Sequence, residues 1–594
     1  MASSSNTTSS DSDCCNDIPV RLHTVEHSST SGDERFAFAA SRKSKISDDP
    51  VSHRSAGRHG AVGPEQTYRN HYETTVFADT ALMTSMTVLV LGDQLSTTHG
   101  PLSRRPDERV LMIEATEFGR RLPYHPHKLT LLFSAMRHFR DDLREQGRNV
   151  DYQQVETFEE GLDAHFDAFP NDELVVMRPS SFRAGEQLGD LVAQYGGDLD
   201  VVDNDLFLCS RELFDDWAGD ETSYRHENFY RFMRRETGYL MADGEPVGGE
   251  WNYDDQNRET PPPEYSPPEP PSFEPNETTE SVREWVEETF TGGYDVPPLG
   301  GDWADPEPFR WPVTREQART VLDHFVSDRL DTFGPYQDAM RAENWAMHHS
   351  LLSAALNLGL LHPRNVLDRV TQAAHERDVP LNSVEGFLRQ VLGWREFVRH
   401  VYRREMPGLA TANQLDQTEP LPEAFWTGET DMACLSDVVD GVRKRGYSHH
   451  IERLMILSNF ATLLGVEPQS LNRWFHAAYV DAYHWVTTPN VVGMGTFGSP
   501  VLSTKPYVSS ANYVDKMSDY CGDCPYYKTK TTGERACPFN ALYWDFLDRN
   551  AGTLQDNHRM GLVYSHLDDK SDDELEAIRD RAAALRDRAR QGTL

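Results

Sequence analysis

The sequence predicts two folded domains: an α/β domain built on a parallel sheet, followed by an all-helical domain. Strand-like and helix-like runs alternate between residues 86 and 205, Pro-rich segments interrupt the chain at 244–310, and helical patterns alone follow Pro312. Alternating strands and helices are typical of βαβ crossovers and therefore of a parallel sheet. The length of 594 residues is also too great for a single hydrophobic core.

Residues 1–85 form a tail rich in Ser, Thr, Asp, His and Arg, without sustained apolar periodicity. Such a composition cannot bury enough apolar surface to offset the entropy lost on ordering. We therefore predict a disordered, low-complexity tail. Translation could instead begin at Met83 or Met86. In that case the tail would be an artefact of the gene assignment.

The predicted α/β domain covers residues 86–205. Its first strand is the apolar run that begins at Met86 and ends in the polar loop Gly92-Asp93-Gln94. Ligands bind beyond the carboxyl ends of such strands, where Gly92 and Asp93 would lie, although Asp93 taken alone also suits a helix cap or a loop. Further elements are expected as an amphipathic helix at 127–145 and strands at 109–115, 149–155 and 173–177.

Residues 206–311 are predicted to connect the two domains, because Pro261-Pro262-Pro263 and the prolines at 267–271 favour extended chain. The helical domain is then expected at 312–594. Its helical periodicity is found at 315–330, 348–360, 384–405, 436–464, 468–486 and 571–590.

The chain is strongly acidic, with 95 Asp and Glu against 58 Lys and Arg and a net charge of −37. In ordinary salt this excess would oppose binding to a phosphate backbone. Because the charge is spread along the chain, it also fits adaptation to concentrated salt, where repulsion is screened within about 3 Å at 1 M. The sequence shows no apolar run long enough for a membrane span and no export signal. We predict a cytoplasmic, halophilic protein for which nucleic acid is not excluded.

Cysteines near the C-terminus form the strongest chemical motif. Cys521-Gly-Asp-Cys524 is a CxxC knuckle, Cys537-Pro538 follows it, and Cys434 is available as a fourth thiol. Four thiolates suit an iron–sulfur cluster or a tetrahedral zinc ion, and a single knuckle with a Cys-Pro pair favours iron–sulfur. Redox-active or inert thiols are the third interpretation.

Other motifs of the helical domain have both structural and functional interpretations. The segment 384–399 has the pattern of an ordinary amphipathic core helix with a basic edge. His450 shares a helix face with Leu454 and Leu457, so it should point inward, where a histidine is commonly a hydrogen-bonded core residue. Tryptophans normally contribute packing, but beside a redox cofactor they can pass electrons; here they stand at 394, 426, 474, 485 and 544.

Longer motifs in a fixed order point to one family. They are LVLGDQL at 89–95, HSLLSAALNLGLL at 349–361, VEGFLRQVLGWREFVR at 384–399, FWTGETDMACL at 425–435, GYSHHIERLM at 446–455, WFHAAYVDAYHWVTTPN at 474–490, and MSDYCGDC with ACPFNALYWDFL within 517–547. On these motifs residues 86–594 resemble the photolyase/cryptochrome superfamily, and specifically its iron–sulfur bacterial branch, which includes the prokaryotic (6-4) photolyases. The resemblance implies an antenna domain followed by a helical domain that binds FAD.

The resemblance also implies site residues by position. The residues that would bind FAD are Tyr336, His349, Ser350, Leu352, Ser353, Gln390, Arg395, Asp481 and Asn490. A [4Fe–4S] cluster would be ligated by Cys434, Cys521, Cys524 and Cys537. A lumazine-type antenna chromophore would lie near Gly92, Asp93 and Glu114. His450 matches the catalytic histidine, with His449 beside it, and the electron-relay positions are Trp474 and Trp426.

The implied activity is light-driven repair of UV-damaged DNA, in which excited FADH⁻ passes an electron to a flipped-out lesion, expected to be a (6-4) photoproduct. His450 would supply the proton, since a histidine can give and regain one near neutrality. Alternatives are repair of cyclobutane dimers, a non-repairing blue-light photoreceptor and a metal-stabilised DNA-binding module. Phe475 stands where relatives commonly have a relay tyrosine, and Thr487 stands where they often have a carboxylate. These two differences leave the photoreceptor as an alternative. A monomer is expected.

Overall fold

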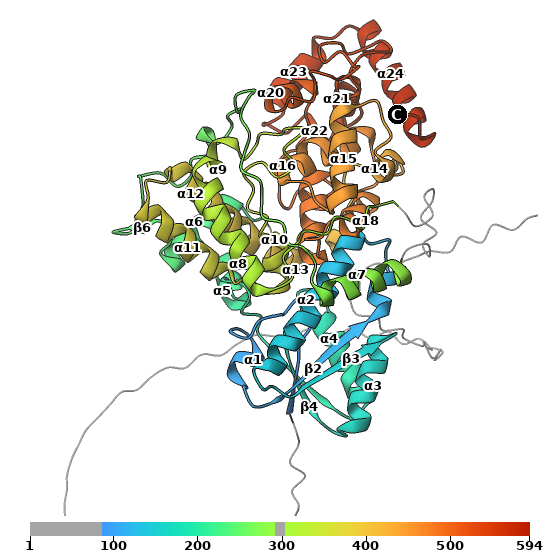
Figure 1. Cartoon of the computed structure of the whole chain (residues 1–594). Helices are drawn as coiled ribbons and strands as arrows, with labels where there is room; N and C mark the ends of the chain where they lie inside the picture. Colours follow the sequence, from blue (N-terminus) through green and yellow to red (C-terminus); the bar gives the residue numbers. More distant parts are fainter. Residues whose placement is uncertain (1–85, 222, 291–302) are drawn as a thin grey trace, which may run out of the picture. The chain divides into compact units, whose positions relative to one another are not determined.

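The computed structural model describes residues 86–221, 223–290 and 303–594. All of them belong to one compact unit that includes Thr84–Leu594. The predicted disordered tail at 1–85 lies outside the described residues. Figure 1 shows the sheet and its helices, formed by the earlier part of the described chain, and the larger set of helices that follows.

The sheet has five strands in the order β3-β2-β1-β4-β5, and every neighbouring pair is parallel. The predicted parallel sheet is therefore confirmed. Its strands are β1 (Met86–Leu89), β2 (Arg109–Ala115), β3 (Val150–Val155), β4 (Glu173–Met177) and β5 (Asp198–Val202). The three central strands are almost wholly buried, which explains their apolar sequences. The edge strand β5 was not predicted from the sequence, because Asp198 and Asp200 interrupt its apolar pattern.

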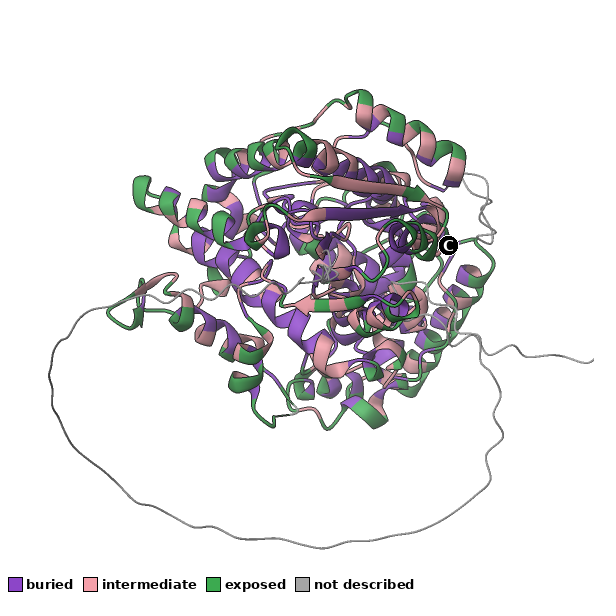
Figure 2. Cartoon of the chain, turned by 90° about the horizontal axis from the view of Figure 1, so that it is seen from below, coloured by how far each residue is buried: buried purple, intermediate pink, exposed green. Residues whose placement is uncertain are grey.

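Helix α2 (Pro126–Glu145) corresponds to the helix expected at 127–145. It packs against α7 (Glu277–Phe290), where the rings of Phe133 and Trp285 lie 5.0 Å apart at 77°. The other helices between the strands are α1 (Pro101–Arg104), α3 (Phe158–Ala168) and α4 (Ala184–Gln194). Figure 2 shows that buried residues gather on the inward-facing sides of the helices and strands, while exposed residues mark the outward-facing sides.

The region expected to connect the domains contains regular structure that the sequence analysis did not predict. It includes α5 (Arg211–Ala218), α6 (His226–Thr237), the hairpin of β6 (Met241–Ala242) and β7 (Glu245–Pro246), and α7. The Pro-rich loop is extended, but it is held in place: Arg341 donates to the carbonyls of Pro261 and Pro262 at 2.6 Å, and Arg329 donates to that of Pro268 at 2.9 Å. Carbonyls are the polar groups that proline retains, and arginines use them here.

The helical region contains α8 (Arg315–His324), α9 (Leu330–Tyr336), α10 (Ser353–Leu358), α11 (Pro363–Glu376), α12 (Leu381–Leu388), α13 (Glu396–Glu405), α14 (Ala424–Thr427), α15 (Ala433–Arg445), α16 (His450–Glu452), α17 (Asn459–Leu464), α18 (Pro468–Ala478), α19 (His484–Thr488), α20 (Ala511–Met517), α21 (Pro538–Arg549), α22 (Ala551–Leu554), α23 (Gly561–Asp568) and α24 (Asp572–Arg590). Three predicted helices are shorter or divided. The one expected at 348–360 begins only at Ser353, and breaks at 446–449 and 479–483 divide two others. Gly446 has a φ of 63°, a backbone conformation that ends α15.

Three wide, π-helical segments interrupt these helices: η4 (Arg389–Arg395), η6 (Arg453–Ser458) and η7 (Pro489–Gly495). A further one, η3 (Phe325–Arg329), joins α8 to α9. π-Helical turns are rare in proteins overall, but many of those that occur lie at functional sites. None of the helices within the described ranges has both the length and the apolar character needed to cross a bilayer.

Candidate active site: a cavity and a cysteine pocket

The helical region encloses a cavity of about 1030 Å³, which we call the cavity. This is at the upper end of the range typical of cofactor sites, about 300–1,000 Å³. The π-helical segments η4, η6 and η7 all contribute to its wall, together with the start of α10 and the loop at 505–509. The wide turns thus bring together side chains from three separate segments.

The cavity gathers the residues expected to bind FAD, apart from one. Its lining includes His349, Ser350, Leu352, Ser353, Gln390, Arg395, Asp481 and Asn490. Tyr336 is the exception: it lies at the end of α9, where its ring packs 5.3 Å from that of Tyr265. Phe475 and Thr487, the two departures from the family pattern, also line the cavity.

Arg395 shows that the cavity carries unused hydrogen-bond donors. Its guanidinium lies 4.0 Å from the centre of the Phe207 ring and 3.1 Å from the carboxylate of Glu396. Burial lowers the pKa of Arg395, although Glu396 counteracts this effect. Its Nε and the Nε2 of His349 are buried and have no hydrogen-bond partner within the described chain. Buried donors of this kind fit an anionic, hydrogen-bonding group such as a diphosphate.

Asp481 provides a fixed negative charge in the same cavity. It accepts two hydrogen bonds from Arg453, at 3.0 and 3.1 Å, and one from the Ser353 hydroxyl at 2.7 Å. Burial alone would raise the pKa of this carboxyl, but Arg453 and Ser353 outweigh it and hold the pKa below its ordinary value. Asp481 is therefore ionised and can accept an N–H from a bound ring.

Three histidines meet at the cavity. The rings of His349 and His449 stack 4.5 Å apart at 16°, and the ring of His450 meets that of His349 edge-on at 5.0 Å. Burial, followed by the charge of His449, lowers the pKa of His349 far below its ordinary value, so that His349 is neutral near pH 7. His449 is fully buried behind the lining.

The expectation that His450 points into the core is wrong. Its side chain is 47% exposed and lines the cavity, with Nε2 at 3.8 Å from Asp338. The shared face with Leu454 and Leu457 does not persist, because α16 ends at Glu452 and the wider η6 follows. The structure thus places a solvent-accessible histidine on the wall of the cavity.

The predicted relay tryptophans form an edge-on series that leads away from the cavity. Phe475, in the lining, lies 5.1 Å from Trp474, and Trp474 lies 6.5 Å from Trp426 between ring centres. Trp303, which the sequence analysis missed, continues the series at 5.0 Å from Trp426. It stands in the region expected to be linker, where nothing nearby in the sequence indicates its partner.

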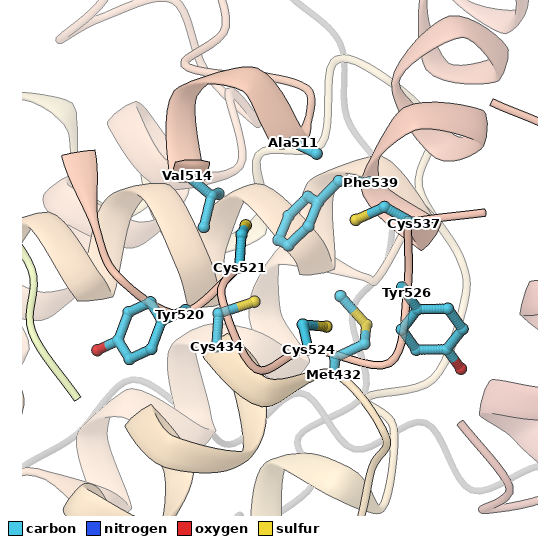
Figure 3. A pocket seen from close by; sticks show the side chains of 10 residues that line it. All are labelled: Met432, Cys434, Ala511, Val514, Tyr520, Cys521, Cys524, Tyr526, Cys537 and Phe539. Atoms are coloured by element: carbon cyan, nitrogen blue, oxygen red, sulfur yellow. The ribbon is translucent and has the colours of Figure 1, made fainter. Parts of the chain in front are cut away.

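The four predicted cysteine ligands line one small pocket, which we call the cysteine pocket (Figure 3). Cys434 lies in the first turn of α15, Cys521 and Cys524 follow α20, and Cys537 immediately precedes α21. Burial raises the pKa of Cys537 to about 12 and that of Cys521 to about 11. The rest of the lining is mostly apolar and consists of Met432, Ala511, Val514, Tyr520, Tyr526 and Phe539.

Within the described ranges, no group of three or more His, Cys, Asp or Glu side chains is arranged so that it could hold a metal ion. A zinc ion would require four sulfurs about 2.3 Å from one centre, and therefore about 3.8 Å from one another. A four-iron cluster binds each thiolate to a different iron and spreads the sulfurs more widely. The shared pocket brings four thiols together, which is the donor set that either group requires.

The three predicted antenna residues lie at one edge of the sheet. Leu89 of β1 pairs with Leu111 of β2, so that Gly92 and Glu114 both stand near the carboxyl ends of these neighbouring strands. A side chain at Gly92 would collide with Leu132, which would lie 2.9 Å from its Cβ. Asp93 is partly exposed beside it. The buried Glu114 carboxylate is held by hydrogen bonds from Arg137, Tyr152 and Gln154.

Comparison with known proteins places the chain in a family. The family model of deoxyribodipyrimidine photo-lyase-related proteins matches residues 88–294. A (6-4) photolyase of Agrobacterium fabrum is 39% identical over 514 residues, which cover 84% of this chain and 99% of that protein. An uncharacterised mimivirus protein, R855, is 35% identical over 97 residues, or 16% of this chain and 72% of that protein.

Among solved structures, a bacterial class III photolyase from Agrobacterium tumefaciens superposes with a TM-score of 0.53. It covers 87% of this chain and all of that one at 15% identity, and supports the fold. The predicted photolyase/cryptochrome architecture is thereby confirmed. The 39% identity along nearly the whole of the Agrobacterium fabrum relative supports a closer relationship than a shared fold. The chain therefore belongs to the photolyase/cryptochrome superfamily, among its photolyase-related proteins.

Proposed function

We propose that the protein is a light-driven DNA photolyase that repairs (6-4) pyrimidine photoproducts. The observation that carries this proposal is His450, a half-exposed histidine on the wall of a cavity large enough for a flavin and an extruded nucleotide. The similarity to a protein named (6-4) photolyase supports the same conclusion. A damaged base must leave the duplex to be reached, and a lesion that pairs poorly is cheaper to extrude.

FAD is the cofactor that the family and the cavity support. Arg395 and His349 offer the buried donors that suit its diphosphate, and the ionised Asp481 offers an acceptor for the N–H groups of its ring. Ser353 and Asn490 stand in the same wall. When bound, a reduced flavin supplies an electron on excitation by blue light.

The charge of the cavity wall supports damaged DNA as the substrate. The lining contains Arg or Lys at seven positions and Asp at three, the reverse of the balance in the whole chain. Burial and the nearby Arg559 lower the pKa of Lys505, so two like charges face one region of the wall. Arg258, Lys516 and Arg559 are exposed there. Cations grouped in this way suit the phosphates on either side of a flipped nucleotide.

Proton transfer is assigned to His450. His349 is held neutral by burial, so it is not the proton donor near pH 7. His450 is half-exposed in the cavity, can exchange protons with solvent and lies beside His349. It donates a proton to the lesion and later regains one, as a general acid and then base.

We assign the cysteine pocket to a [4Fe–4S] cluster. Four thiols share one pocket, and burial raises the pKa of Cys434, Cys521 and Cys537. A cationic cluster would offset the cost of burying their thiolates. The ligands come from α15, from the loop after α20 and from the start of α21, so the cluster would tie together segments far apart in the sequence. Trp474 and Trp426 are assigned to electron supply, and the edge near Gly92, Asp93 and Glu114 to an antenna chromophore.

A second candidate, a non-repairing blue-light photoreceptor, is favoured by Phe475. Its ring stands between Trp474 and the cavity, where a phenol could be oxidised and a phenyl ring cannot. Thr487, also in the wall, cannot hold a charge. Both differences affect how the flavin is reduced and leave His450 in place.

Illumination of the purified protein with short duplexes tests the proposal. One duplex contains a (6-4) photoproduct, a second a cyclobutane dimer and a third no damage. We expect chromatography to show restored thymines from the first duplex, only in light and only with wild-type protein. Flavin reduction in light without restored thymines from any duplex would identify the photoreceptor instead. Restoration confined to the second duplex would identify a cyclobutane-dimer photolyase.

A further inference from the structure

A buried carboxylate, Glu452, lies directly behind the cavity histidines. It is 3% exposed, and its Oε2 accepts a hydrogen bond from the backbone N–H of His449 at 3.1 Å. Its Oε1 accepts from the Tyr520 hydroxyl at 3.1 Å and lies 3.1 Å from Nε2 of His449. The ring N–H is not aligned for a regular hydrogen bond, so this last contact is electrostatic. One side chain therefore contacts both the backbone and the ring of the residue that precedes His450.

The surroundings leave His449 as the basic group in closest contact with Glu452. Arg453, the next residue, donates to Asp481, and no Arg or Lys in the described part of the chain forms an ion pair with Glu452. Burial, followed by the charge of Glu452, raises the pKa of Asp437 to about 7. The charged and titratable groups that face Glu452 from the surrounding segments are Asp437, Arg445, Tyr447, His449, Tyr479 and Tyr520.

His449 connects this carboxylate to the cavity. Its ring stacks on His349, and His349 meets the ring of His450. Glu452 is the anion that contacts the ring of His449. A carboxylate at this distance favours a protonated imidazole over a neutral one.

We propose that Glu452 is a positioning residue for repair: it fixes the turn that presents His450 and favours a proton in the histidine cluster. The proposal rests on the proposed function. Glu452 acts on His449 from behind and does not touch the substrate, since it is absent from the lining of the cavity. Its two effects can be separated, because a glutamine keeps the shape and the acceptor oxygen but removes the charge.

The test compares repair against pH for wild-type protein and Glu452→Gln. We expect the alkaline limb of the curve to move to lower pH by roughly one unit, because the neutral glutamine no longer favours a proton on the neighbouring histidines. Repair in that limb then falls about tenfold at a fixed pH. Flavin absorption and the affinity for lesion DNA in the dark should stay unchanged. An unchanged pH profile in a folded Glu452→Gln protein would overturn the proposal.

Nitrogen NMR of the histidines in the dark protein supplies a readout that does not depend on repair. We expect the histidine ring signals that titrate in wild-type protein to titrate about one unit lower in Glu452→Gln. Glu452→Asp keeps the charge and withdraws it from the ring, so it should give a smaller shift in the same direction. Should Glu452→Gln fail to fold, absence of any shift in Glu452→Asp would contradict the proposal.

Asp545→Asn is the matched control. Asp545 is also 3% exposed and pairs with Arg549 at 2.8 Å and with Arg586, but it does not line the cavity. The substitution should lower the melting temperature and leave both the pH profile and the histidine titration in place. An equal pH shift in this control would show that loss of any buried carboxylate has the same effect, and would contradict the proposal. Failure of wild-type protein to repair any lesion would instead count against the proposed function.

Discussion

The cavity and the cysteine pocket handle buried charge in opposite ways. In the cavity, Asp481 is compensated by Arg453, and Arg395 by Glu396, so charges are balanced by the protein itself. In the cysteine pocket, burial drives Cys434, Cys521 and Cys537 toward the neutral form, and the other lining residues supply no cation. The protein itself therefore compensates the charges of the cavity, whereas thiolates in the cysteine pocket would need a cationic ligand to compensate them.

Removing a pocket thiol should have the largest effect on the whole molecule. We expect Cys521→Ala to lose any cluster absorption and to become much less soluble, because segments from Cys434 to Cys537 are no longer tied together. Absorption spectra and the yield of soluble protein measure this. Cys209→Ala is the control, since Cys209 is buried outside the pocket. A soluble, fully active Cys521→Ala protein would show that the pocket has no structural ligand.

Replacing the cavity histidine should abolish chemistry without affecting the fold. We expect His450→Ala to reduce (6-4) repair by at least about a hundredfold, the usual contribution of a general acid. Flavin absorption and melting temperature should match those of the wild type, because the side chain is half-exposed. Repair is followed by chromatography of illuminated DNA. A His450→Ala protein with normal repair would remove His450 from the mechanism.

Breaking the charge compensation of the cavity should cost stability in a pH-dependent way. Asp481→Asn leaves Arg453, whose side chain is 25% exposed, without its charged partner, which costs at most about 3 kcal/mol. Since the folded pKa of Asp481 lies below its ordinary value, its stabilisation is present above about pH 4 and is lost as the pH falls further. Melting curves should therefore differ most near neutrality and converge in acid. A difference that does not shrink below pH 4 would contradict this account.

Salt concentration should have the smallest effect on stability, and it should act mainly through the exposed charges. The net charge of −37 predicts that the melting temperature rises with KCl, because screening weakens repulsion among exposed carboxylates. Asp481 is buried and Arg453 is mostly shielded from solvent, so the difference between wild-type protein and Asp481→Asn should change little over the same range. A melting temperature that does not rise with KCl would count against a halophilic origin.

Much of the fold and of the candidate site could be predicted from the sequence. Apolar runs identified four of the five strands, and the order of the motifs identified most residues of the cavity wall and the four thiols. What could not be predicted depended on tertiary contacts. The edge strand β5 is acidic, and α7 is recognisable only once α2 is present to cover it. The exposure of His450 depends on where α16 gives way to η6. Trp303 meets Trp426 across a sequence separation that no local pattern records.

The π-helical segments around the cavity make the length of each helix as important as its composition. Every such segment accommodates one more residue than an α-helix would over the same rise. Deleting a single residue from η4 would turn the wide turn into an ordinary α-helical one, which has one residue fewer with which to line the cavity. For this protein, one-codon deletions in η4, η6 or η7 should be more damaging than most substitutions there.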